Sequence, residues 1–201
     1  KNNRRLYVVI MVLIFTIGAV VRLAWLDTSP YSVNFDEAAL GYNTYSLIKT
    51  GRDEYGYKWP VSLRSFNDYK PALYAYLSMP FVSWLGLNNV SIRLVSALSG
   101  LLSLGVLYLL LGVFIKDKWR QLIIWGILSM EPWRIHFSRI ALETNLSMAL
   151  FVSGAYLLLT IRKNDLKRQK LKLACLMVLL SLSAYAYHSA RVVVPVLLFF
   201  W

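Results

Sequence analysis

The sequence predicts an all-α integral membrane protein, a multi-span helical bundle with two surface (juxtamembrane) helices in its first outer loop. The chain has 201 residues, of which 58% are hydrophobic and 16% are charged, and its mean hydropathy is +0.52. A soluble domain of this length needs more charged side chains to cover its surface. The hydrophobic residues also occur in long blocks and not in short periodic stripes, which is typical of membrane spans.

Hydrophobic blocks along the chain are expected to cross the membrane as helices. The first block follows a basic start and resembles a signal peptide, but the sequence DTSPYSV after it has no small-residue cleavage site, so we interpret it as an anchor. Near its outer end, Arg22 is expected to reach the lipid headgroups. We expect residues 1–201 to be the N-terminal part of a larger transmembrane domain. The expected spans are residues 6–26, 90–115, 121–137, 145–161, 171–187 and 192–201 onward.

The basic residues indicate the orientation of the chain. The formal net charge is +12, and Lys and Arg cluster beside the hydrophobic blocks. Cytoplasmic loops carry such clusters, so we expect a multi-pass protein of the plasma (inner) membrane with a cytoplasmic N-terminus. Topology thereby explains the charge, with binding of anionic lipid headgroups as a second role, and we expect no nucleic acid partner. The clusters are Lys1–Arg5, Lys116–Arg120 and Arg162–Lys172.

This orientation places a long loop, residues 27–89, and most acidic residues on the outer side of the membrane. Two apolar, aromatic segments of the loop, residues 36–50 and 71–85, are expected to form helices on the outer membrane surface, because they are too short or too polar to span it. Any chemistry is therefore expected at the outer face. The chain has no Gly-rich phosphate loop, zinc-ligand spacing or nucleophile elbow. Cys175 is the only cysteine, so an intrachain disulfide is excluded.

Local signals define the ends of the two surface helices. Asn34 and Glu37 have the spacing of a capping box at the start of the first helix, and Gly51 is placed to end it. Pro71 is expected in the first turn of the second helix. The side chains that share one face of the first helix at helical spacing are Ala38, Tyr42, Tyr45 and Ile48.

Adjacent carboxylates, Asp36 and Glu37, begin the first surface helix directly after the first span. A carboxylate there could act as a general base. Acids in a first turn also stabilise the helix dipole, so a purely structural role remains an alternative. Further along the loop, Lys70 could hold a phosphate oxygen and Asp68 could orient it or bind a metal, with a solvated turn as the alternative.

Arg139 and Glu143 lie in the outer link between the third and fourth predicted spans. Ionisable residues at such a link are costly unless they are paired or functional. If the link is helical, the two form a local i,i+4 ion pair; the alternative is that Arg139 contacts a lipid phosphate. For His188, in the next outer link, an interfacial position is favoured over a role as acid or ligand.

The order of these segments resembles the GT-C superfamily of membrane glycosyltransferases, in particular the protein mannosyltransferase and lipid A aminoarabinose transferase group. No single motif is decisive, but five occur in order and cover nearly the whole chain. One departure is Lys-Pro-Ala at Lys70, where many members have Lys-Pro-Pro. The motifs are FDEAALGYNTYSLIKTG, FNDYKPALYAYL, NVSIRLVSALSGLLSLGVLYLL, PWRIHFSRIALETNLSMAL and LSAYAYHSARVVVP.

The resemblance implies a polyprenyl-phosphate sugar donor and an active site at the outer membrane surface. By the family pattern, Asp36 is the catalytic base, Glu37 supports it, and Glu143 is a second acidic position near the bound sugar or acceptor. Residues expected to contact the donor phosphate are Lys70 and Arg139, with Arg93 and Arg191 as further cationic candidates. Asp68 lies near a metal-binding position of some relatives, which makes a divalent metal a candidate cofactor.

These observations together predict an inverting transfer of sugar from the polyprenyl-phosphate donor to a glycan, lipid or protein acceptor, with membrane lipids as the other partners. The main alternative is a lipid-linked sugar transporter or flippase, whose binding residues lie near the bilayer midplane. Here the ionisable residues lie at span ends on one face, which favours an interfacial enzyme. A second alternative is a non-catalytic homologue that only binds the lipid-linked sugar.

Overall fold

The computed structural model describes residues 2–65, 68–161 and 169–200. Two helices are long and apolar enough to cross a membrane, α1 (Asn2–Leu23) and α4 (Asn89–Phe114), and a third crossing results if α6 (Pro132–Ser138) and α7 (Glu143–Thr160) are counted as one bent span. This architecture confirms the predicted helical membrane class. The other helices are α2 (Phe35–Thr50), α3 (Leu73–Leu85), α5 (Lys118–Ser129), α8 (Lys170–Ala186) and α9 (Ala190–Phe199).

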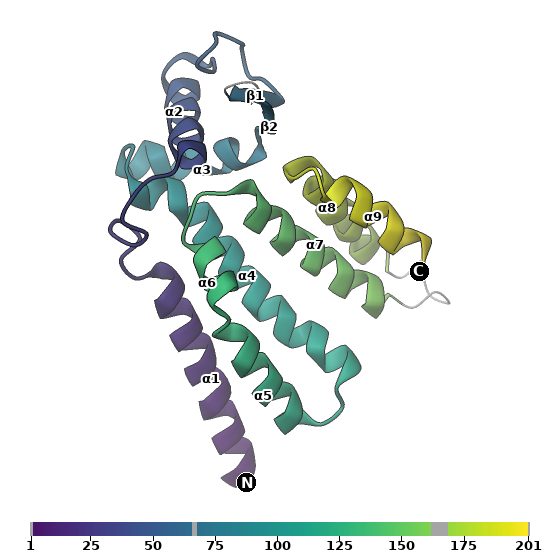
Figure 1. The fold of residues 1–201 in the computed structure, drawn as a ribbon. Coiled ribbons are helices and arrows are strands. Elements are labelled where there is room, and N and C mark those ends of the chain that lie inside the picture. Colours follow the sequence, from purple (N-terminus) through teal and green to yellow (C-terminus); the bar gives the residue numbers. More distant parts are fainter. Residues whose placement is uncertain (1, 66–67, 162–168, 201) are drawn as a thin grey trace.

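Helix α4 forms the centre of the bundle (Figure 1). It contacts α1, α5, α6 and α7, and α8 and α9 pack beyond α7. The N-terminus lies at one end of the bundle, whereas α2, α3 and a small hairpin gather at the other end (Figure 1). The parts of the predicted basic clusters at residue 1 and residues 162–168, and the last residue of the final predicted span, lie outside the described residues.

The ends of the first surface helix are confirmed. Asn34 accepts a hydrogen bond from the backbone N–H of Glu37, whose side chain accepts one from the backbone N–H of Asn34, which completes the predicted capping box. Gly51 ends α2 in the left-handed conformation, with φ of 68°, which glycine adopts without steric cost. The start of the second helix was predicted wrongly, because Pro71 is the last residue of a strand and α3 begins at Leu73.

A short antiparallel hairpin, β1 (Ser62–Ser65) and β2 (Asp68–Pro71), precedes α3 and was not predicted. Leu63 of β1 is buried and pairs with Lys70 of β2. Tyr76 of α3 and Tyr185 of α8 donate hydrogen bonds of 2.6 Å to the backbone carbonyls of Pro60 and Val61. The hairpin is therefore held against both the surface helices and the bundle, which fixes the position of β2.

The stretch predicted as one helix over residues 121–137 is divided into α5 and α6. Helix α5 ends at Ser129, and Pro132 is the first residue of α6. Proline has no N–H to donate to the preceding turn and disfavours helical conformation in the residue before it, which accounts for the extended ψ of 120° at Glu131. A second bend, of 114°, separates α6 from α7. The bundle is thus interrupted twice, between α5 and α6 and between α6 and α7.

The surface helices α2 and α3 pack through a hydrophobic core on the end of the bundle that lies opposite to the N-terminus (Figure 1). This core joins α2 and α3 to α4 and α7, and it includes Leu40, Leu47, Tyr74 and Ile92. The aromatic face that the sequence indicated on α2 points outward instead, because Tyr42 and Tyr45 are 55% and 40% exposed. The buried face of α2 combines the two leucines with Glu37, Gly41, Asn43 and Thr44.

A buried ion pair connects α2 to α4. The guanidinium of Arg93 donates bidentately to the carboxylate of Glu37, with Nε–Oε1 of 2.8 Å and Nη2–Oε2 of 3.1 Å, and both side chains are buried. Arg93 also donates to the backbone carbonyls of Leu26, Pro30 and Ser32. Each N–H of this guanidinium therefore has an acceptor, which the burial of a charge requires.

Replacing Arg93 by Met is expected to destabilise the protein by about 3–5 kcal/mol, because it leaves the Glu37 carboxylate buried without its partner. The matched control is Arg134→Met, since the Arg134–Glu131 pair is 33% and 43% exposed and should contribute at most about 1 kcal/mol. Unfolding of both variants in SDS, followed by circular dichroism, measures the difference. Equal losses in the two variants would show that burial of the Arg93 pair has no special weight.

Helix α4 approaches α6 closely at Gly100. A Cβ atom added there would overlap the side chain of Ser138, whereas one added at Gly105 would meet no atom within 4 Å. We expect Gly100→Ala to cost about 1–3 kcal/mol through overpacking. Gly105→Ala should stabilise the same helix by about 0.5–1 kcal/mol. The same unfolding measurement distinguishes the two, and a stabilising Gly100→Ala would contradict the close approach.

Candidate functional site

Asp36 and Lys70 meet at the end of the bundle opposite to the N-terminus (Figure 1). Asp36 lies in the first turn of α2, and its carboxylate forms an ion pair with the ammonium group of Lys70 on β2. The Asp36 side chain is 49% exposed and the Lys70 side chain is 16% exposed. The capping box orients the start of α2, and the hairpin orients β2, so two independent local structures bring these charges together.

Glu143 lies beside this pair, at the first position of α7. It is 6% exposed, and its Oε1 atom has no hydrogen-bond partner among the described residues. The charges of Lys70, Asp36 and His188 act electrostatically on its carboxylate. His188 is exposed in the turn between α8 and α9. Four ionisable side chains from four separate segments are therefore gathered at one end of the bundle.

Sequence reasoning gave His188 an interfacial role because a single histidine in a short link carries little information. Its proximity to Glu143 results from the packing of α7 against α8 and α9. Ser147 and Ser183, which form hydrogen bonds with one another across α7 and α8, hold these helices in register. No sequence signal available from one chain indicates this pairing.

Arg139 has a different environment from the one predicted. It forms no ion pair with Glu143 among the described residues, and residues 139–142 are not helical, so the condition for an i,i+4 pair is not met. The reason is that the link bends at this point and Arg139 ends α6 instead of continuing into α7. Its terminal nitrogens donate to the backbone carbonyls at the end of α1 and in the segment after it. These carbonyls belong to Val21, Ala24, Trp25 and Ser29.

The remaining predicted phosphate contacts differ in accessibility. The Arg93 guanidinium is fully buried and all of its donors are used within the fold. Arg191 is exposed in the first turn of α9, where its Nε donates to the Ala184 carbonyl over 3.3 Å. Arg139 is partly buried and donates to four main-chain carbonyls, whereas Lys70 is 16% exposed and Arg191 is exposed.

Asp68 is exposed at the end of the hairpin, where its carboxylate accepts a 2.8 Å hydrogen bond from the backbone N–H of Tyr69. Within the described parts of the chain, His, Cys, Asp and Glu side chains form no group of three or more with the geometry of a metal site. No step of the chemistry considered below is assigned to a metal.

Glu37 holds the backbone near Glu143 in place. Its Oε1 accepts a 2.8 Å hydrogen bond from the backbone N–H of Ala141 in addition to the Arg93 contact. The buried carboxylate thereby fixes the α6–α7 link, two residues before Glu143, against the start of α2. Glu37 positions the neighbouring groups and has no free acceptor of its own to offer a substrate.

This arrangement combines an accessible carboxylate, an adjacent ammonium group and a second, buried carboxylate with a free oxygen. A carboxylate in such a position can accept a proton from a hydroxyl group, and an ammonium group can stabilise an oxyanion. The site therefore offers a candidate base and a candidate cation for an oxyanion. Neither role requires a nucleophilic serine or cysteine.

Comparison with protein families gives one result. The sequence model described as dolichyl-phosphate-mannose-protein mannosyltransferase (PMT) matches residues 11–200. Neither the curated proteins nor the solved structures gave a match. The family match covers nearly the whole chain, including α2, the hairpin and the α6–α7 link. The chain therefore belongs to the dolichyl-phosphate-mannose-protein mannosyltransferase family of membrane glycosyltransferases.

Proposed function

We propose that this protein transfers a sugar from a polyprenyl-phosphate-linked donor to an acceptor hydroxyl at the outer face of the membrane, with inversion at the anomeric carbon and Asp36 as the base. The observation that carries the proposal is the contact between Asp36 and Lys70 beside the buried carboxylate of Glu143. Family membership supports a lipid-linked sugar donor.

Asp36 is the carboxylate best placed to act as the base. Half of its side chain is exposed, whereas Glu37 is buried and bound by Arg93. In the proposed step the acceptor oxygen attacks the anomeric carbon, the bond from that carbon to the phosphate oxygen breaks, and the hydroxyl proton passes to Asp36. The lipid phosphate departs with the bonding electron pair.

Lys70 is assigned to the departing phosphate. Its ammonium group is fixed by β2 and mostly shielded from water, so it can stabilise the negative charge that develops on the phosphate oxygen. Arg191, exposed on α9, is a further predicted phosphate contact at this end. Arg93 and Arg139 are assigned to the scaffold, because the main chain and Glu37 accept the hydrogen bonds of their guanidinium groups.

Glu143 is assigned to the hydroxyl groups of the bound sugar or acceptor. Its Oε1 atom has no partner, so a substrate hydroxyl can donate to it without displacing an existing hydrogen bond. A buried acceptor that lacks a donor favours binding of a group that supplies one. Glu143 would thus contribute to orientation of the sugar and not to proton transfer.

The outer location follows from the charges at the two ends of the bundle. The N-terminus and the α4–α5 turn lie at the end opposite to α2 and the hairpin (Figure 1). That opposite end carries basic residues with Asp117 as their acidic neighbour, whereas the Lys and Arg residues of the segment that holds α2 and the hairpin are mixed with acids such as Asp53, Glu54 and Asp68. The basic residues of the opposite end are Arg4, Arg5, Lys116, Lys118 and Arg120. By the positive-inside rule it faces the cytoplasm, so the proposed site faces outward from the plasma (inner) membrane.

The first test compares Asp36→Asn with the wild-type protein in sugar transfer. Full-length protein is given labelled polyprenyl-phosphate donors, beginning with mannose because of the family match, and a panel of acceptors. Loss of the base is expected to lower the rate by about 10²–10⁴-fold. The matched control is Asp27→Asn, an exposed carboxylate of the same loop that bonds only weakly to Thr28, and it should retain the wild-type rate.

Equal activity of Asp36→Asn and the wild type would remove Asp36 from the mechanism. No transfer by either protein, while the donor still binds, would instead indicate a non-catalytic homologue or a transporter of lipid-linked sugar.

The stereochemical course provides an independent prediction. A single displacement by the acceptor oxygen gives a product with the opposite anomeric configuration to the donor, because attack and departure occur on opposite faces of the sugar. Digestion of the product with anomer-specific glycosidases, or its NMR coupling constants, determines the configuration. Retention would exclude a single in-line displacement with Asp36 as the base.

A further inference from the structure

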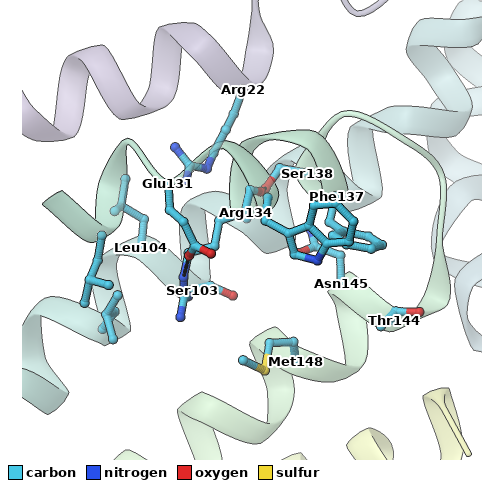
Figure 2. Close-up of a pocket in the computed structure, with 14 residues that line it drawn as sticks. Arg22, Ser103, Leu104, Glu131, Arg134, Phe137, Ser138, Thr144, Asn145 and Met148 are labelled. Atoms are coloured by element: carbon cyan, nitrogen blue, oxygen red, sulfur yellow. Dashed lines mark hydrogen bonds and ion pairs between the residues drawn. The ribbon is translucent and has the colours of Figure 1, made fainter. Parts of the chain in front are cut away.

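A pocket of about 340 Å³ lies within the bundle, between α1, α4, α6 and α7 (Figure 2). Its walls are mostly apolar and include Leu104, Trp133, Phe137 and Met148. It shares no residue with the Asp36, Lys70 and Glu143 cluster. Its walls include Ser138 and Thr144, which lie on either side of the α6–α7 link. Its volume is within the range of small-molecule sites.

Arg22 contributes a buried charge to this pocket. It is 2% exposed, so the expectation that it extends to the headgroups is wrong. Its Nη1 and Nη2 atoms donate to the carbonyls of Gly18, over 2.9 Å, and Ser129, over 3.1 Å. Its Nε atom has no partner among the described residues, and the same holds for the Ser103 hydroxyl in the pocket wall. Two buried donors are thus available to a ligand.

The charges of the pocket do not cancel. Arg134 donates to the carboxylate of Glu131 over 2.8 Å, and Figure 2 shows Arg22 extending from α1 toward this pair. Among the described residues that line the pocket, two arginines face one glutamate, so one positive charge has no counterion there. A buried charge without a partner is costly, and Nε together with a terminal nitrogen forms the fork with which arginine binds phosphate oxygens.

We propose that this pocket binds the phosphate group of a single-chain lipid that is not the sugar donor, with Arg22 and Ser103 contacting the phosphate and the apolar walls enclosing the start of the chain. The two helices that supply these donors, α1 and α4, are the ones long enough to cross the membrane, so a lipid can reach the pocket from the bilayer. Ionisable residues within membrane-spanning helices commonly mark a binding site.

Ordered water is the competing occupant. A water molecule could accept the Nε–H of Arg22 and satisfy the Ser103 hydroxyl, since the pocket is large enough for several. Water leaves the excess positive charge without a counterion, whereas a phosphate neutralises it. Saturable binding of an added lipid phosphate therefore distinguishes a phosphate site from a pocket that holds only water.

Native mass spectrometry of the full-length protein, titrated with 1-oleoyl lysophosphatidic acid, provides the test. Two further probes separate the parts of the ligand: mono-oleoylglycerol has the same chain without phosphate, and inorganic phosphate lacks the chain. We expect one saturable adduct with lysophosphatidic acid and none with mono-oleoylglycerol. Saturable binding of inorganic phosphate as well would support the anion site and show that the chain is dispensable.

Variants assign that adduct to the pocket. Arg22→Gln is expected to weaken binding by at least about tenfold, because it removes a fully desolvated charge from the contact. Arg120→Gln, the same change at an exposed arginine on α5, should leave binding unchanged. If Arg22→Gln fails to fold, Ser103→Val serves instead, since it narrows the pocket without removing any hydrogen bond found in the described residues.

Unchanged binding in both Arg22→Gln and Ser103→Val, or no saturable adduct with the wild type, would overturn the proposal in favour of water. Asp36→Asn should bind lysophosphatidic acid as the wild type does. The pocket can therefore be confirmed or rejected independently of the proposed sugar transfer.

Discussion

The ion pair between Glu37 and Arg93 is the contact on which the end of the bundle that carries α2 and the hairpin depends. The two side chains join α2 to α4, and their remaining hydrogen bonds hold the segment after α1 and the link between α6 and α7. Asp36 precedes Glu37 in the chain, and Glu143 follows Ala141 by two positions. The proposed base and the buried acceptor are thus placed by one contact, which itself has no access to substrate.

Neighbouring or similar residues have different roles here because their surroundings differ. Successive residues of a helix point about 100° apart, so Asp36 faces the surface while Glu37 enters the core. The three arginines Arg22, Arg93 and Arg139 all donate to main-chain carbonyls at breaks or ends of helices. A guanidinium can satisfy several carbonyls at once, whereas a lysine forms a compact point charge. This difference leaves Lys70 as the cation suited to a reacting phosphate.

The parts of the fold that could be predicted depend on residues close together in the sequence. The capping box of Asn34 and Glu37, the end of α2 at Gly51 and the two long spans all follow from local pattern. Pro132 was a local signal for the division of α5 and α6. The prediction of one helix over residues 121–137 followed the hydrophobicity of the stretch and did not use this proline. The hairpin was not predicted because its four-residue strands are too short to show a clear alternation.

The partners of the charged residues could not be predicted, because they are distant in the sequence. Asp36 and Lys70 were each identified as candidates, but their contact depends on the packing of α2 and the hairpin. The burial of Arg93 and Arg22 likewise follows from helices that meet only in the folded chain. Residue type and position at a span end indicate which charges deserve study, and only the tertiary structure separates those that bind the main chain from those that remain accessible.

The pairing of Leu63 with Lys70 in the hairpin has a consequence for how the sequence of this region can change. Side chains alternate between the two faces of a strand, so a single-residue insertion or deletion within β2 would turn Lys70 away from Asp36 and present a neighbour in its place. A two-residue change would keep the face but move the ammonium group by about 6–7 Å along the strand. The length of β2 is therefore constrained, because the ammonium group of Lys70 must lie beside Asp36. Surface loops of this kind usually tolerate changes in length.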